Sequence, residues 1–127
     1  MRIFDLEIDG KTYKACCGIR ALAKLQKEYG SLKEFENKIF PRAEDDEAES
    51  DSSYYEKINY QALLDTTMLF LEEGAEATES EIPQKEVVYL ASNPVQLATD
   101  VFAIYVGSML PEEEDTEKNS ESQTEER

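Results

Sequence analysis

Hydrophobic and polar residues alternate along the first part of the chain. The opening segment RIFDLEI places Phe4, Leu6 and Ile8 on one side, and this period of two predicts a half-buried strand. Asp9 and Gly10 follow, a dipeptide that tolerates the positive φ angles of a two-residue turn, and KTYKACC then supplies a returning strand. We therefore predict an N-terminal β-hairpin whose apolar face packs on the helices that follow.

From residue 18 the hydrophobic period becomes helical. A helix over 18–29 is predicted to end at Gly30, and its apolar face comprises Ile19, Leu22, Ala23, Leu25 and Tyr29. Ser31 and Glu34 have the spacing of a capping box, which starts a short helix that Pro41 ends. This second helix turns Leu32, Phe35, Ile39 and Phe40 toward the core.

Three more helices follow in the second half of the chain. A long one is expected from about residue 54 to 73, with Gly74 as its stop and with the apolar residues Ile58, Ala62, Leu63, Leu64, Met68, Leu69 and Leu71. Another starts near Pro83 and buries Val87, Val88 and Leu90. Asn93 caps the last helix, from Pro94 to Leu110, which is apolar nearly all round.

The last helix has 17 residues with Asp100 within it, so it is too short to span a membrane. We expect it to be the central helix of a small bundle, or to leave a face open for a partner or a second copy. The predicted fold class is mainly α with a small N-terminal β-hairpin (α+β). It forms a single domain over residues 1–111, a compact bundle of about four to five helices.

Charge changes this picture in two segments. The chain has 29 acidic and 13 basic residues, a net charge of -16. Residues 42–53 have a net charge of -5 and residues 112–127 one of -6, with little apolar surface to offset the entropy of ordering. We predict that the first is a disordered acidic loop and the second a disordered acidic tail. The remaining 99 residues are then only mildly acidic, at -5.

The composition also excludes several classes of function. An acidic chain is a poor ligand for nucleic acid or for anionic membranes. The absence of His removes Ser-His and Cys-His nucleophiles and most zinc sites. Cys16 and Cys17 lack a CxxC spacing and are interpreted as reduced thiols that pack in the core. The stretch from Asp45 to Glu56 resembles a calcium loop but has Ser50 where the turn requires Gly.

No nucleotide-binding, hydrolase or metalloprotease motif is present in the sequence. We therefore predict that the protein is not an enzyme and has no catalytic residues, no cofactor and no metal site. The first residues lack the continuous apolar stretch of an export signal, which predicts a cytoplasmic protein.

The segment LEIDGKTYKACCG followed by IRALAKLQKEYGSLKEF resembles tail assembly chaperones of long-tailed (siphovirus-type) phages and prophages of Gram-positive bacteria. In that family a strand, a DG turn and a second strand lead into a helix of the type GΦRALxxLEKxYGSL. Residues 8–13 and 18–32 match this scheme, and the likeness covers about the first 40 residues closely. The adjacent cysteines and the acidic insertion at 42–53 depart from it.

The resemblance implies a small helical cytoplasmic protein that binds the tape measure protein, keeps its hydrophobic helices in solution and helps recruit tail-tube subunits. It also implies a longer form made by ribosomal frameshifting, which the protein sequence leaves open. Oligomer formation by the chain itself stays open too. As partner-binding residues we select apolar positions of the first and last helices: Ile19, Leu22, Leu25, Val101, Phe102, Tyr105 and Met109.

A second hypothesis comes from the charge alone. An acidic protein can mimic DNA and inhibit a nucleic-acid enzyme of the host, if its carboxylates are fixed on ordered surfaces. Most of the net charge lies instead in the two segments predicted to be disordered. We therefore place this hypothesis second.

Overall fold

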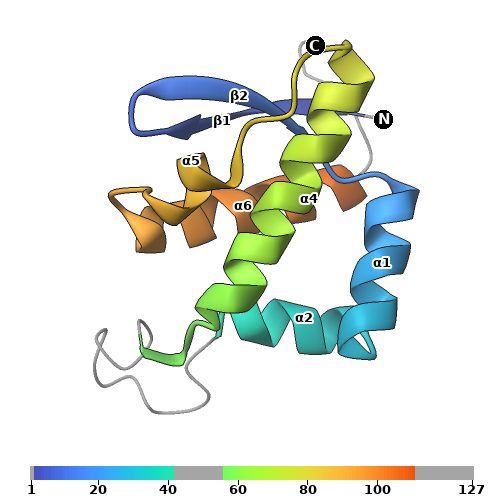
Figure 1. Cartoon of the computed structure of the whole chain (residues 1–127). Helices are drawn as coiled ribbons and strands as arrows, with labels where there is room; N and C mark the ends of the chain where they lie inside the picture. Colours follow the sequence, from blue (N-terminus) through green and yellow to red (C-terminus); the bar gives the residue numbers. More distant parts are fainter. Residues whose placement is uncertain (1, 42–55, 111–127) are drawn as a thin grey trace, which may run out of the picture.

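The computed structural model describes residues 2–41 and 56–110. It confirms a mainly helical fold with an N-terminal two-stranded hairpin (Figure 1). The elements are β1 (Ile3–Ile8), β2 (Lys11–Cys16), α1 (Ile19–Tyr29), α2 (Leu32–Ile39), α4 (Tyr60–Thr78), α5 (Lys85–Tyr89) and α6 (Pro94–Met109). The acidic loop predicted at 42–53 and the tail at 112–127 lie outside the described residues.

The hairpin has the register that its sequence predicts. Ile8 pairs with Lys11 across the turn, in an antiparallel ladder. Asp9 and Gly10 have φ angles of 52° and 84°, the left-handed conformations that a two-residue turn requires. Leu6 and Ile8 are buried while Asp5 and Glu7 are exposed, so one face of the sheet lies on the core.

Gly74 was expected to stop the long helix, and this prediction is wrong. α4 begins at Tyr60, where the Asn59 side chain accepts a hydrogen bond from the backbone N–H of Ala62 at 3.0 Å, and it continues through Gly74 to Thr78. The helix ends where Glu79 adopts a left-handed conformation, with φ at 57°.

Gly74 has a packing role instead of a terminating one. A Cβ atom at this position would lie 2.2 Å from the backbone oxygen of Lys14 in β2. The missing side chain therefore lets α4 and the hairpin approach at backbone distance. Sequence alone cannot distinguish this use of glycine from a helix stop, because both leave a glycine after an apolar helical pattern.

α4, and not α6, is the central helix. It packs against both strands and against each of the other helices described, whereas α6 contacts the hairpin, α2 and α4. Figure 1 shows α4 running diagonally across the molecule, with α1 and α5 on opposite sides and α6 behind. The face of α6 that points away from these elements is less covered. The buried residues of α6 are Leu97, Ala98, Val101, Ile104 and Tyr105.

Two predicted faces need correction at their ends. In α1 the buried residues are Ala21 and Leu25, whereas Ile19 is 85% exposed and Ala23 is exposed. α5 begins at Lys85 rather than Pro83, and it buries Val88 but leaves Leu90 73% exposed. The inner face of α2 is confirmed, because Phe35 and Ile39 are fully buried.

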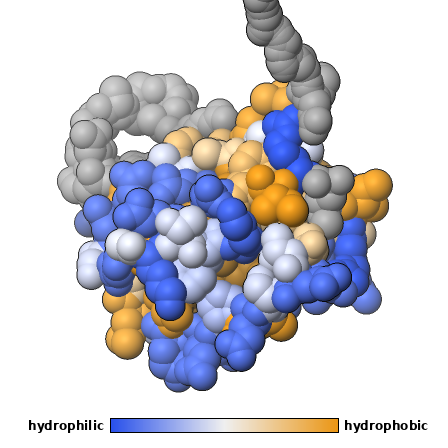
Figure 2. Space-filling model, turned by 90° about the horizontal axis from the view of Figure 1, so that it is seen from above, coloured by the Kyte–Doolittle hydropathy of each residue, from blue (hydrophilic) through white to orange (hydrophobic). Residues whose placement is uncertain are grey.

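The surface is mixed in character. Figure 2, seen from the hairpin side, shows hydrophilic residues over most of this face, with hydrophobic residues gathered in smaller areas. Among the helices that the structure describes, none combines the length and the apolar character that crossing a membrane requires.

Candidate functional site

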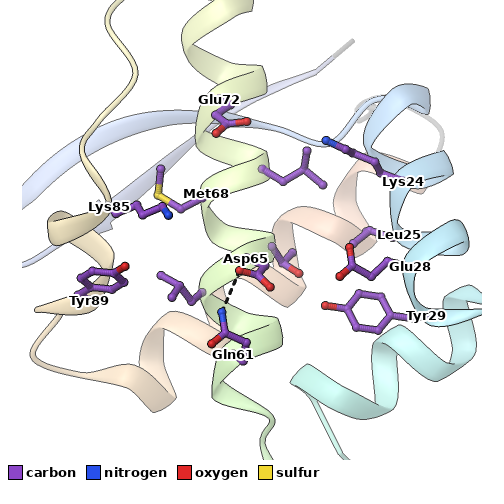
Figure 3. Close-up of a pocket in the computed structure, with 13 residues that line it drawn as sticks. Lys24, Leu25, Glu28, Tyr29, Gln61, Asp65, Met68, Glu72, Lys85 and Tyr89 are labelled. Atoms are coloured by element: carbon purple, nitrogen blue, oxygen red, sulfur yellow. Dashed lines mark hydrogen bonds between the residues drawn. The ribbon is translucent and has the colours of Figure 1, made fainter.

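A groove of about 450 Å³ lies over α4. α4 forms its floor, and α1 and α5 form its two walls (Figure 3). Its lining mixes apolar and charged side chains: Lys24, Leu25, Glu28 and Tyr29 from α1, Gln61, Leu64, Asp65, Thr66, Met68, Leu69 and Glu72 from α4, and Lys85 and Tyr89 from α5.

The floor of the groove follows one stripe of α4. Gln61, Leu64, Met68 and Glu72 recur at helical spacing, so they share a face of the helix. Met68 is 9% exposed, and Leu64 and Leu69 beside it are only partly buried. Apolar surface therefore remains open to solvent along the middle of the floor, with polar side chains at both ends.

The α1 wall is held in place by the core. Leu25 is 3% exposed and anchors the helix, while the ring of Tyr29 contacts the ring of Phe35 with centroids 5.7 Å apart. This contact fixes the position of Tyr29 at the lower end of the groove. Figure 3 shows Glu28 and Tyr29 directed from α1 toward Asp65 on α4.

The lower end of the groove is acidic and polar. Burial, followed by the nearby carboxylates of Glu28 and Asp65, raises the pKa of Tyr29, and the Thr66 hydroxyl opposes that rise. Asp65 accepts a hydrogen bond from Gln61 Nε2 at 3.0 Å. Within residues 2–41 and 56–110, neither Glu28 nor Asp65 forms an ion pair with a lysine or arginine.

A second hollow continues the groove toward the C-terminal end of α4. It shares Lys24, Leu69 and Glu72 with the first. In this hollow Arg20 donates to Glu73 Oε2 at 2.9 Å and also to Glu76. Because Glu73 is only 5% exposed, the guanidinium compensates a carboxylate that the fold has largely removed from water.

The seven partner-binding residues selected from the sequence do not lie together in the structure. Leu25, Val101 and Tyr105 are buried in the core, Leu22 and Phe102 are partly buried, and Ile19 and Met109 are 85% and 45% exposed. The hydroxyl of Tyr105 donates to Glu36 Oε2 at 2.6 Å. Val101 and Tyr105 are buried away from the groove lining and cannot contact a partner unless the core opens, and of the seven only Leu25 lines the groove.

From the sequence, the apolar groove residues Leu64, Met68 and Leu69 were predicted only as part of the apolar stripe of the long helix. Leu64, Met68 and Leu69 fit a helical stripe equally well whether a neighbouring helix covers them or not. One signal that could have separated them is the number of charged residues on the same stripe. Asp65 and Glu72 interrupt it, which is unusual for a fully covered helix face.

The cysteines do not form a reactive site. Cys16 and Cys17 are free and buried, as predicted. Burial, followed by the charge of Glu73 and the neighbouring thiol, raises the pKa of Cys17 to about 12, so the thiolate is disfavoured at neutral pH. In the part of the chain that the structure describes, no group of three or more potential ligands could hold a metal ion.

Comparison with protein-family models, with curated proteins and with solved structures gave no match to this chain.

Proposed function

We propose that this protein is a non-catalytic tail assembly chaperone of a phage or prophage. In this proposal it binds helical segments of the tape measure protein and helps recruit tail-tube subunits. The observation that supports it best is the groove over α4, whose apolar floor is partly exposed between two helical walls. The second support is the resemblance of the first 40 residues to that family.

The dimensions of the groove suit a helix. Gln61 and Glu72 are eleven residues apart on α4, which corresponds to about 16 Å at the helical rise. A bound helix of three to four turns would match this length, and leucines on one of its faces would cover Leu64 and Leu69. Each apolar side chain that becomes buried contributes about 1.5–3 kcal/mol before the costs of association.

The net charge of the chain suits the same role. A carrier of hydrophobic helices must stay in solution while its ligand is apolar, and a net charge of -16 keeps complexes apart by repulsion. Much of this charge lies outside the described residues, so binding at the groove does not depend on it. Charge and groove therefore supply two separate requirements, solubility and contact.

Co-expression with a tape measure protein, which the proposed function expects in a neighbouring gene, tests the proposal. We expect the two proteins to co-purify and the soluble yield of the tape measure protein to increase several-fold. Leu69→Glu, which places a charge on the groove floor, should abolish both effects. Leu110→Glu, at a residue 57% exposed and outside the groove lining, is the matched control and should leave them unchanged. Absence of any complex with the unaltered chain contradicts the proposal.

The hypothesis of an acidic inhibitor makes a different prediction. An inhibitor that uses the carboxylates of residues 112–127 should weaken when this segment is deleted. A chaperone that uses the groove should retain binding of the tape measure protein. Measuring that binding with the truncated chain therefore separates the two functions.

A further inference from the structure

We infer that the groove over α4 binds an amphipathic helix in which a lysine or arginine lies beside the apolar stripe, and that this cation is held between Glu28 and Asp65. The inference rests on the proposed function and names the chemistry of its partner. It is derived from four side chains at the lower end of the groove: Glu28, Tyr29, Asp65 and Thr66.

The two carboxylates approach each other from different helices. Glu28 comes from α1 and Asp65 from α4, and Figure 3 shows both beside the Tyr29 hydroxyl. Like charges on facing helices repel, and no described lysine or arginine lies within ion-pair distance of either carboxylate. A cation supplied by a partner would remove the repulsion and gain two carboxylate acceptors.

Thr66 is a separate observation at the same place. It is 1% exposed and lines the groove, and its hydroxyl has no hydrogen-bond partner of ordinary geometry. A looser side-chain hydrogen bond with Tyr29 acts to lower the pKa of that tyrosine. The next residue, Thr67, donates to the backbone oxygen of Leu63 at 2.7 Å, which is the usual way for a helical threonine to be satisfied. A buried hydroxyl without such a bond leaves an acceptor available to a donor in the groove.

Away from Glu28 and Asp65, the groove lining holds two lysines, Lys24 and Lys85, and one carboxylate, Glu72. Lys24 extends from α1 toward the end of α4 where Glu72 lies, and Arg20 is bonded to Glu73 and Glu76 in the adjoining hollow. The lower end of the groove therefore holds two carboxylates that have no ion-pair partner among the described residues, whereas both lysines of the lining lie toward the other end. A bound helix with one cation at its end has a preferred direction in the groove, because the opposite direction would place that cation beside Lys24.

Two synthetic peptides of 18 residues test the inference with the full chain. Both have the same leucine stripe, and they differ only in two lysines or two glutamates that flank one end of it. Fluorescence anisotropy of labelled peptides gives the Kd of each. We expect the lysine peptide to bind about tenfold more tightly at low salt, and the difference to shrink as added salt screens the pair.

Charge-neutral variants locate the effect. The double variant Glu28→Gln, Asp65→Asn keeps the size of both side chains, and the new amide oxygen at position 65 can still accept the hydrogen bond from Gln61. It should remove the preference for lysine while leaving binding of the leucine stripe. Glu7→Gln, Glu81→Gln is the matched control, because both residues are exposed and outside the groove lining. Equal Kd values for the two peptides, or a preference unchanged in the groove variant, would overturn the inference.

Further results separate this inference from the proposed function. If the tape measure protein co-purifies equally with the unaltered chain and the Glu28, Asp65 variant, and the peptides bind alike, the chaperone function stands and the cation site fails. If the lysine peptide is preferred but no tape measure protein binds, the site stands and the function fails. Light scattering that shows a dimer dependent on Glu28 and Asp65 would identify a second copy as the occupant, which also overturns the inference.

Discussion

Replacing Gly74 by alanine has two effects of opposite sign on the stability of the protein. Alanine is a better helix former than glycine by about 1 kcal/mol in a helix interior, so propensity alone predicts a more stable protein. The structure predicts the opposite, because the added Cβ would lie 2.2 Å from the Lys14 oxygen, where ordinary contacts begin near 3.4 Å. The neighbour is backbone, which cannot move aside as a flexible side chain can.

The size of the effect follows from that separation. α4 and β2 must move apart by about 1 Å, which loosens the packing of buried residues such as Phe70 and Leu71. Overpacking of a core costs about 1–3 kcal/mol and occasionally more, and we expect a net loss of about 3 kcal/mol for a backbone clash of this kind. In a domain of this size such a loss lowers the Tm by roughly 10–20 °C.

Thermal and urea unfolding followed by circular dichroism measure this loss. Gly107→Ala is the control, because the new Cβ would meet the Phe4 ring at 3.1 Å, and a side chain can yield. We expect Gly107→Ala to cost less than Gly74→Ala. If Gly74→Ala is as stable as the unaltered protein or more so, helix propensity decides the outcome, and the close approach of α4 to the hairpin is refuted.

Three further predictions concern single contacts. Tyr105→Phe removes the hydrogen bond to Glu36 and should lower the free energy of unfolding by about 1.5 kcal/mol in urea titrations. The pKa of Cys17 is raised from 9.0 to about 12 on folding, so this thiol stabilises the fold fully below pH 9 and progressively less as the pH rises toward 12. Unfolding titrations between pH 9 and 11 should therefore show a shallower decline for Cys17→Ala than for the unaltered protein. Asp9→Ala loses the hydrogen bond from the Ser92 backbone N–H at 3.1 Å and tolerates a φ of 52° poorly, which should cost about 1–2 kcal/mol, whereas Asp9→Asn should be nearly neutral in the same assay.

Local patterns predicted the elements whose signals are complete within a few residues. The DG turn, the Ser31 cap and the Asn93-Pro94 start of α6 each contain their own physical cause, and all are present. The alternation in β1 also assigned its buried face correctly. These predictions succeeded because no distant residue is needed to decide them.

Predictions that depend on residues far apart in the sequence were wrong or incomplete. The role of Gly74 is set by Lys14, sixty residues earlier, and no local pattern contains that contact. Likewise, the apolar pattern of α6 fits a central helix, but the hairpin lies against α4 and makes that helix the centre. The groove was missed for the same reason, because a stripe on α4 becomes a floor only when α1 and α5 stand at its sides.

In the proposed function, the groove over α4 contacts the tape measure protein. Photo-crosslinking in the co-expressed complex tests it directly, with a photoreactive amino acid placed at Gln61 or Leu69 in the groove, or at Ile19 or Met109 on exposed positions outside its lining. We predict crosslinks to helical segments of the tape measure protein from positions 61 and 69, and few from 19 and 109. Efficient crosslinking from positions 19 and 109 with none from the groove would contradict the proposed role of the groove.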